Sequence, residues 1–240
     1  MNEVLATYLG RTKFENTWKL QKELLSLIEK KHIKDIILLN EHEHVYTIGK
    51  TGSENHLLAN NQELRSRGIE VFFIDRGGDI TYHGPGQLVG YPIIDLNRYY
   101  LDIHRYLRDL EQIIILTLKD FNIIAKHDPN FTGVWINNNK IAAIGVKVYR
   151  WITMHGFALN VNTDLSYFDR IIPCGIFHKG VTSMQSLLNR EINMIDVVSK
   201  LLKNFELVFN CKISYLNDKD FINLINKINI RNDEWSQVKQ

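Results

Sequence analysis

The chain has 240 residues, of which 45% are hydrophobic, and this is enough for one large domain with a well-buried core. The net charge is only +2, which excludes a protein that coats nucleic acid or binds membranes through a polybasic surface. Cys174 and Cys211 are the only cysteines, too few for a disulfide framework, and no apolar run has the length of a membrane span or forms a signal segment after Met1. We therefore expect a reduced, soluble, cytoplasmic protein that binds neither nucleic acid nor membrane.

Helical and strand-like segments alternate along the chain. Apolar residues recur near helical spacing in three segments, and the shorter apolar or alternating runs between them are typical of strands. In chain order, these patterns predict a helix over residues 14–30, strands over 35–40, 44–49 and 69–75, a helix over 102–121, strands over 132–136, 140–149 and 152–161, and a helix over 194–209. A strand and a small polar helix are predicted from Ser214 onward.

The asparagine run at 137–139 suits a turn with positive φ, so the strands on either side of it are predicted to form a hairpin. Strands grouped between helices indicate an α+β fold built in layers, in which helices flank a central mixed, largely antiparallel sheet. We expect residues 1–213 to form one catalytic domain. Residues 214–240 are expected to be a C-terminal extension of it and not a separate domain.

One segment, residues 76–96, holds five glycines and two of the four prolines of the chain. The pair Gly77 and Gly78 permits a sharp turn and leaves no side chain between the backbone and a neighbour. The Gly-Pro-Gly run at 84–86 forms a rigid corner, since proline fixes φ. Two ordinary loops between strands are the alternative, but the polar residues at 81–83 between the two corners favour the wall of a ligand site.

Three common kinds of functional site are excluded because residues that each one requires are missing from the sequence. The GKT run at 49–51 resembles the end of a phosphate-binding loop, but the required glycine five positions before Gly49 is replaced by His44. His42 and His44 alternate on a predicted strand without a third ligand at metal-binding spacing, so we expect no metal site. No G-x-S-x-G elbow of a serine hydrolase occurs.

Cys174 is the remaining candidate for a nucleophile. It lies between Pro173 and Gly175, in a tight turn that can direct the thiol into a cleft. Without context, a lone cysteine is more often a small buried hydrophobic residue than a catalytic one. Cys211 lies in an ordinary strand-like run.

Lys140 begins the run KIAAIGVKVY. Strand alternation places it on the same face as the apolar residues Ala142, Ile144, Val146 and Val148, so its side chain is expected to point to the packed side. Desolvation there would lower the pKa of the amine and make it a usable base. The alternative is a lysine at a turn that extends to water. The small residues around it, Ala142, Ala143 and Gly145, leave volume that could admit an aliphatic chain.

Four segments, RGGDITYHGPGQLVGYPI, KIAAIG, HGFALN and PCGI, resemble the lipoyl(octanoyl) transferases in order and spacing, and LNEHEHVYTIGK resembles an earlier segment of that family. The resemblance extends over about residues 5–212. It implies a fold like that of biotin/lipoate protein ligases and a monomer without cofactor or metal. The implied reaction transfers an octanoyl group from octanoyl-acyl carrier protein to a lysine of lipoyl domains. Such acceptors are subunits of 2-oxoacid dehydrogenases and the H protein of glycine cleavage.

By this resemblance, the catalytic residues are Cys174, which would carry the acyl group as a thioester, and Lys140. Contacts with the acyl chain and substrate are implied at Arg76, Gly77, Gly78, Asp79, Ile80, Thr81, Tyr82, His83, Ala143, Ile144, Gly145, Gly156, Phe157 and Ala158. The glycines expected to line a narrow slot for the acyl chain are Gly77, Gly78, Gly84, Gly86 and Gly90. Glu43 replaces a proline and Lys147 an arginine that are common in the family. Candidates for a basic rim toward an acidic carrier are Arg76, Lys147, Arg150 and Lys179.

A thioester already holds an activated acyl group, so its exchange to a cysteine and attack by an amine need no ATP. Lys140 is expected to take the thiol proton, to protonate the departing carrier thiol and later to deprotonate the incoming amine. Lowering the pKa of a lysine from about 10.4 to about 7.5 costs about 4 kcal/mol, which burial can supply. Three alternatives stay open: an amidotransferase between lipoyl domains, an ATP-dependent lipoate or biotin ligase, and a non-catalytic module that binds the carrier.

Overall fold

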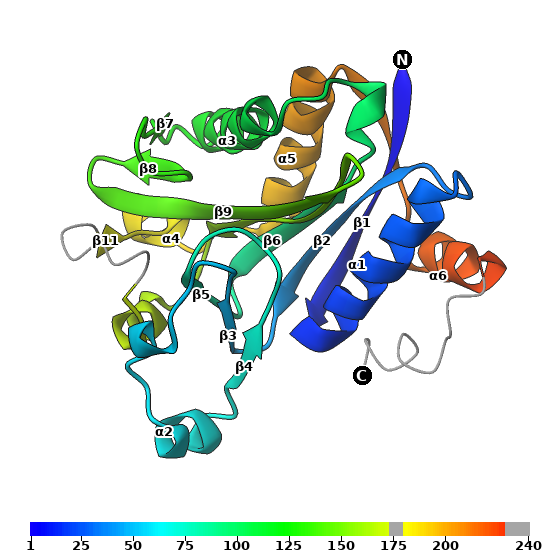
Figure 1. Ribbon diagram of the computed structural model, residues 1–240. Coiled ribbons are helices and arrows are strands. Elements are labelled where there is room, and N and C mark those ends of the chain that lie inside the picture. The colour runs from blue at the N-terminus through cyan, green and yellow to red at the C-terminus, as the bar shows by residue number, and fades with distance from the viewer. Residues whose placement is uncertain (173–179, 229–240) are drawn as a thin grey trace.

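A nine-stranded sheet forms the centre of the computed structural model, which describes residues 1–172 and 180–228 (Figure 1). Its strand order is β12 (Cys211–Tyr215), β1 (Asn2–Thr12), β2 (Asp35–His42), β6 (Gln87–Ile93), β10 (Ile152–Asn160), β9 (Asn139–Tyr149), β8 (Val134–Ile136) and β7 (Lys126–His127), with β11 (Gly180–Val181) paired to β9. β1 is parallel to both of its neighbours, and every pairing from β2 to β7 is antiparallel. The predicted mixed, largely antiparallel sheet is therefore confirmed.

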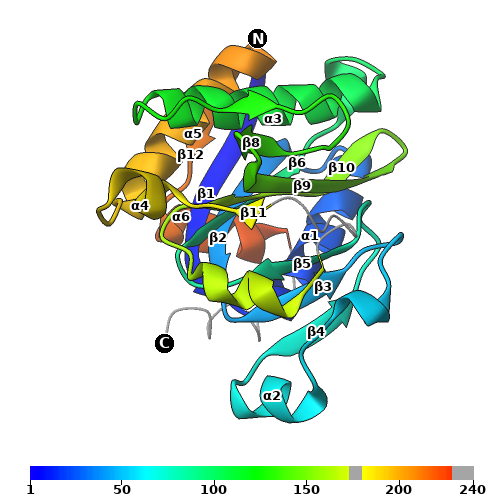
Figure 2. The same ribbon diagram turned by 90° about the vertical axis from the view of Figure 1, so that its left-hand side faces the viewer.

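Helices cover both faces of this sheet (Figures 1 and 2). α3 (Ile103–Lys119) and α5 (Met194–Phe209) pack against each other and against one face, where they enclose the larger core. α1 (Phe14–Glu29) and α6 (Asp218–Lys227) pack on the opposite face around a second core. The layered α+β fold and the three long helices predicted from apolar spacing are confirmed.

Polar caps define the ends of these helices. The Asn193 side chain accepts a hydrogen bond from the backbone N–H of Ile195 at the start of α5, and Asn210, with φ +47°, ends the helix in the left-handed region. At the start of α3, the Asp102 carboxylate accepts from the backbone N–H of Arg105. These short polar side chains satisfy backbone groups that have no partner within the helix.

The first strand, β1, has no counterpart among the sequence predictions. Buried and half-buried residues alternate along it only over short stretches, because it is an interior strand with helices on both faces of the sheet, and its register with β2 shifts between Tyr8 and Arg11. At the other end of the chain, the boundary expected between residues 213 and 214 falls inside β12. Phe221 and Ile225 of α6 are buried in the core that α1 also covers, so residues 214–228 continue the same sheet and core.

A second, three-stranded sheet lies below the large one in Figure 1. Its order is β4 (Glu70–Phe73), β3 (Val45–Ile48) and β5 (Ile80–His83), and its neighbours are α2 (Asn61–Ser66), η1 (Glu54–His56) and η3 (Leu165–Arg170). The sequence patterns predict two of these strands. The third, β5, lies in the glycine-rich segment 76–96, for which they predict only loop corners. β6 lies in the same segment, and η2 (Leu96–Arg98) begins at its last residue. This segment therefore connects the two sheets.

Asp35 is completely buried at the start of β2. Its Oδ1 accepts a hydrogen bond from the backbone N–H of Asp95 at 3.0 Å and lies 3.3 Å from Nη1 of Arg98. Burial raises the pKa of Asp35 to about 6 from the ordinary 3.8. Because the folded state holds the proton more tightly than the unfolded chain, Asp35 destabilises the fold as the pH rises from about 4 through 6.

We predict that Asp35→Asn increases the free energy of unfolding near pH 7 by about 1–3 kcal/mol, since asparagine keeps an acceptor for Asp95 without a buried charge. Urea unfolding at about pH 4.5 and about pH 7.5 measures this. The gain is expected to be larger at the higher pH. An equal gain at both values would show that ionisation of Asp35 is not its cause.

Candidate active site

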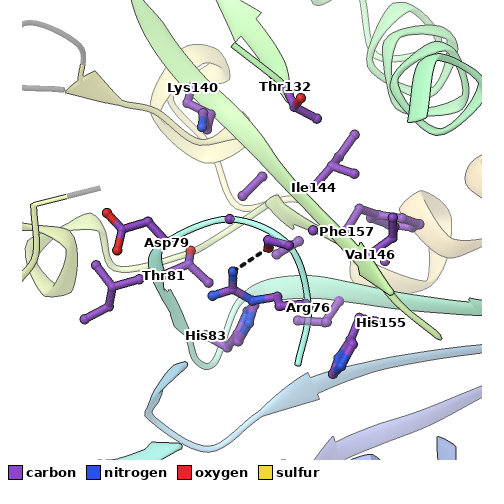
Figure 3. Close-up of a pocket in the computed structure, with 18 of the residues that line it drawn as sticks. Arg76, Asp79, Thr81, His83, Thr132, Lys140, Ile144, Val146, His155 and Phe157 are labelled. Carbon is purple, nitrogen blue, oxygen red and sulfur yellow. Dashed lines mark hydrogen bonds between the residues drawn. The ribbon is translucent and has the colours of Figure 1, made fainter. Parts of the chain in front are cut away.

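A cavity of about 470 Å³ opens between the large sheet and the glycine-rich segment (Figure 3). Its volume lies within the range of about 300–1,000 Å³ typical of small-molecule sites. Fourteen of the sixteen residues expected at the site line it: Arg76, Gly77, Gly78, Asp79, Ile80, Thr81, His83, Lys140, Ala143, Ile144, Gly145, Gly156, Phe157 and Ala158. Residues that are 80 positions apart in the sequence thus share one cavity.

Two of the expected site residues do not belong to this wall. Tyr82 is fully buried on the opposite side of β5, where its ring stacks on Tyr167 at 4.8 Å and its hydroxyl bonds to Nδ1 of His44 at 2.8 Å. Tyr82 therefore supports the wall from behind. Cys174 lies outside the described residues, as does Lys179 of the expected basic rim.

The described chain on either side of the 173–179 segment is tied to the cavity. Before it, the backbone N–H of Ile172 donates to the carbonyl of His56 at 2.8 Å. After it, β11 runs parallel to β9, with Val181 paired to Lys140, and the N–H of Thr182 donates to the Lys140 carbonyl at 3.0 Å. Val181 itself lines the cavity. The backbone thus returns from the segment that contains Cys174 directly beside Lys140.

Lys140 and Ala142 do not share a face, although strand alternation predicts that they do. The β8–β9 register shifts, so that Trp135 pairs with Lys140 but Val134 pairs with Ala142, and Ile141 is an extra residue on β9. Ala142 consequently packs in the core beneath α3, whereas Lys140 lines the cavity. Its Nζ lies 4.8 Å from the centroid of the Trp135 ring. The prediction is wrong for Ala142, because one inserted residue reverses the alternation between it and Lys140, whereas Ile144 and Val146 line the same cavity as Lys140.

Backbone contacts hold the loop at 74–79 against the cavity. The N–H of Gly77 donates to the Val146 carbonyl at 2.9 Å, on the part of β9 beyond its pairing with β8. On its other side, the loop pairs with the GKT run at 49–51, where the Lys50 N–H donates to the Arg76 carbonyl at 3.0 Å. A Cβ at Gly145 would lie 2.8 Å from the Gly77 carbonyl oxygen. Glycine therefore lets three backbone segments touch directly.

The glycines of the expected slot divide into two groups. Gly77 and Gly78 line the cavity as expected, and Gly78 adopts φ +87°, which other residues rarely take. The expectation is wrong for Gly84, Gly86 and Gly90, none of which lines it. An added Cβ at these three positions would collide with the Tyr82 hydroxyl, the Asn162 backbone and the Phe157 ring, respectively. They are needed for packing around the β5–β6 turn and between β6 and β10.

A buried guanidinium and a buried carboxylate stand in the wall. Nη2 of Arg76 donates to the backbone carbonyl and the hydroxyl of Thr47 at 2.7 and 3.0 Å, and Nη1 donates to the Gly77 carbonyl at 3.0 Å, the bond dashed in Figure 3. Asp79 bonds to Nδ1 of His56 at 2.6 Å. Arg76 is only 7% exposed, so it presents positive charge to the cavity and not to the outer surface.

His155, which also lines the cavity, is a residue that the sequence reasoning missed. It has φ +59° in the middle of β10, an uncommon conformation for a residue other than glycine, and its N–H donates to Oε1 of Gln21 at 2.9 Å. Its Nε2 donates to Oδ1 of Asp75 at 2.9 Å, and Lys147 pairs with the other carboxylate oxygen. This contact fixes the end of the 74–79 loop to β9 and β10. Lys147, expected at the carrier rim, thus has a partner within the chain.

Gln87 and Asn160 are two further lining residues that were not predicted. Both stand inside quoted motifs, HGPGQ and HGFALN. The signal that could have found Asn160 is alternation, because it lies two residues after Ala158 and so on the same face of β10. A polar side chain at that position, among small apolar ones, is unlike the rest of the face.

In residues 1–172 and 180–228, no three His, Cys, Asp or Glu side chains gather closely enough to hold a metal ion. In the same ranges, no helix combines the length and the apolar character needed to cross a membrane.

Comparisons with known proteins were made for both sequence and fold. Residues 13–206 match the family model of the lipoyl protein ligase A/B catalytic domain. The chain is 46% identical to an octanoyltransferase of Christiangramia forsetii, over 89% of this chain and 98% of the relative. It is 51% identical to an octanoyltransferase of Rubrobacter xylanophilus, over 82% and 89% of the two chains.

Solved structures with a similar fold are much more distant in sequence. Lipoate-protein ligase A bound with ATP superimposes with a TM-score of 0.73 at 14% identity, over 98% of this chain and 96% of the other. A bi-partite lipoate protein ligase from Thermoplasma acidophilum gives 0.71 at 15% identity, over 100% and 98%. These structures confirm the predicted biotin/lipoate ligase type of fold and, at such low identity, bear on the fold alone.

We predict that Asp75→Asn loosens the loop. Hydrogen bonds from His155 and Lys147 hold the pKa of Asp75 below its ordinary 3.8, so its ionised form stabilises the fold above that pH and less as the pH falls below it. Allowing for partial exposure, the variant should lose about 1–2 kcal/mol at pH 7. Urea unfolding at about pH 7 and about pH 3 should show the deficit shrink at the lower pH.

The matched control is Glu29→Gln, which breaks an ion pair with Arg150, whose side chain is 69% exposed. That exposed pair should contribute little or nothing to the free energy of unfolding. An Asp75→Asn deficit no larger than the control's would refute the clamp.

Proposed function

The chain belongs to the lipoyl protein ligase A/B catalytic domain family and is an acyltransferase, and we propose that it transfers an octanoyl group from octanoyl-acyl carrier protein to a lysine of lipoyl domains. Octanoyl transfer is the activity named for relatives 42–51% identical to it. The proposed acceptors are the lipoyl domains of 2-oxoacid dehydrogenases and the H protein of glycine cleavage. We further propose that the protein is located in the cytoplasm and acts as a monomer.

In the first proposed half-reaction, the Cys174 thiolate attacks the carbonyl carbon of the donor thioester. A new C–S bond forms to Cys174, and the C–S bond to the carrier breaks. Lys140, which has received the cysteine proton, passes it to the departing carrier thiolate. One thioester replaces another, so this step is nearly balanced in free energy and requires no ATP.

In the second proposed half-reaction, the acceptor lysine attacks the acyl-enzyme as a neutral amine. A C–N bond forms, the C–S bond to Cys174 breaks, and the amine proton passes through Lys140 to the Cys174 thiolate. The amide is more stable than the thioester, which drives the transfer forward. Cys174 and Lys140 end the cycle in their starting protonation states.

The observation that supports this proposal best is the position of Lys140. It lines the same cavity as the Gly77–Gly78 loop, and β11 returns beside it from the segment that contains Cys174. Apolar or small residues on β9 and β10, including Ala143 and Ala158, line the cavity nearby. Each buried methylene of an acyl chain contributes about 0.8 kcal/mol, so an eight-carbon chain is favoured over short ones.

We predict that mixing the protein with octanoyl-acyl carrier protein, without ATP, adds the mass of one octanoyl group to the protein. Cys174→Ala should abolish this addition, and Lys140→Met should slow it by at least about 100-fold, because both proton transfers lose their carrier. Intact mass spectrometry measures both. An ATP-dependent ligase or a non-catalytic carrier-binding module would stay unmodified. Modification by an octanoylated lipoyl domain, but not by the carrier, would identify an amidotransferase instead.

We predict that Gly77→Val leaves the protein folded but lowers octanoyl transfer by about tenfold or more, since a side chain enters the space of two or three methylenes. An added Cβ at Gly77 meets only the Val146 carbonyl, at an ordinary 3.6 Å, and the residue has no positive φ, so folding should tolerate it. The measurement is kcat/KM for octanoyl and butanoyl donors. Gly77→Ala is the graded control, and an unchanged octanoyl preference in folded Gly77→Val would contradict the slot.

A further inference from the structure

A chain of buried polar side chains crosses the cavity floor. Nδ1 of His83 lies 2.8 Å from Oε1 of Gln87, and Nε2 of Gln87 donates to Oδ1 of Asn160 at 2.9 Å. Nδ2 of Asn160 then donates to the backbone carbonyl of Thr182 at 3.0 Å. All four residues are more than 90% buried, and His83, Gln87 and Asn160 line the cavity.

Backbone carbonyls determine the direction of every hydrogen bond in this chain. The Thr182 carbonyl can only accept, so Asn160 must donate to it and accept through its own oxygen. Gln87 must then donate through Nε2, which also reaches the Tyr82 carbonyl at 3.2 Å. Its oxygen is left to accept from His83, so the proton of His83 is on Nδ1. Nε2 of His83 therefore carries a lone pair.

The imidazole is held in this state. Burial lowers the pKa of His83 to about 3, and the positive charge of Arg76 acts in the same direction, so the ring is neutral near pH 7. The Phe14 ring lies parallel to the His83 ring, with centroids 6.3 Å apart and an angle of 5° between the planes, and this contact restrains rotation of the imidazole. Within residues 1–172 and 180–228, no group hydrogen-bonds to Nε2 of His83. The cavity thus contains an oriented acceptor.

We propose that Nε2 of His83 accepts a hydrogen bond from the attacking lysine amine of the acceptor protein and acts in the second half-reaction. In the first half-reaction, negative charge develops on the carbonyl oxygen and on sulfur, and a lone pair stabilises neither. The amine is the reactant that brings N–H groups, and holding one of them aims its own lone pair at the thioester carbon. This inference rests on the proposed octanoyl transfer.

Gln87 and Asn160 are positioning residues in this scheme. They fix the tautomer of His83 and connect it to Thr182, whose N–H bonds to the Lys140 carbonyl. One hydrogen-bonded framework therefore positions both His83, which would accept a hydrogen bond from the amine, and Lys140, the proposed base. A change at Gln87 should act through His83 and not on the thioester exchange.

The test compares His83→Asn with His83→Gln. Asparagine can retain the donor to Gln87 but has no atom at the Nε2 position, whereas glutamine can place its amide oxygen near that position. Each half-reaction is followed separately by quenched mass spectrometry, first acylation by octanoyl carrier alone, then transfer from the isolated acyl-enzyme to a lipoyl domain. His83→Asn should slow transfer by about 100-fold and acylation by less than about threefold. His83→Gln should recover at least about tenfold of the lost transfer rate.

Gln87→Leu provides the second variant, because it removes the bond that keeps the proton on Nδ1 while leaving His83 in place. It should also slow transfer selectively, by about tenfold. Equal slowing of both half-reactions in these variants, or no slowing of transfer, would overturn the inference while leaving octanoyl transfer intact. If the wild-type protein forms no acyl-enzyme, the proposed function fails, and this inference fails with it.

Discussion

The cavity depends on direct contact between three backbone segments of the chain. The 74–79 loop hydrogen-bonds to β9 on one side and to the 49–51 run on the other, with glycine at the points of closest approach. A Cβ at Gly49 would collide with the Gly78 carbonyl, and one at Gly145 would press on the Gly77 carbonyl. Side chains at these points would separate the small sheet from the large one. Arg76, Asp79 and His83 would then no longer share a wall with Lys140.

Hydrogen bonds restrict the conformations of the polar side chains around the cavity. Asp75 is held by His155 and Lys147, and the strained φ of His155 persists because both its N–H and its ring are hydrogen-bonded. His83 is held through Gln87. Buried polar groups are costly unless satisfied, so such networks specify one geometry. In the proposed reaction, two protein substrates would be oriented in turn, and this rigidity would help to place both.

Sequence reasoning succeeded where a single pattern determines the structure. Helical spacing located α5 at residues 194–209, and Asn137 adopts the positive φ expected for its turn. It failed where contacts with neighbouring elements determine the structure. The extra residue Ile141 places Lys140 and Ala142 on opposite faces, and the alternation along β1 is interrupted, with helices covering both faces of the sheet. The motifs located the cavity wall, but side-chain direction placed Tyr82 behind it. Gln87 and Asn160 are recognisable only once β5, β6 and β10 are adjacent.

The fold is shared with lipoate protein ligases, one of which was solved with bound ATP, so the fold alone does not set the energy source. The thioester donor proposed here would arrive already activated, and the remaining task would be to hold the acyl chain and to present a nucleophile in each half-reaction. The thiol and the amine must be activated in different ways. The thiol must lose its proton, and the negative charge of the thiolate must be stabilised, whereas the lone pair of the amine must point at the thioester carbon. Lys140 on β9 and His83 on β5 suit these two tasks, since one is a cation in its protonated form and the other a neutral acceptor. In the proposed scheme, their connection through Thr182 would account for the buried polar chain beside a binding site for an apolar acyl chain.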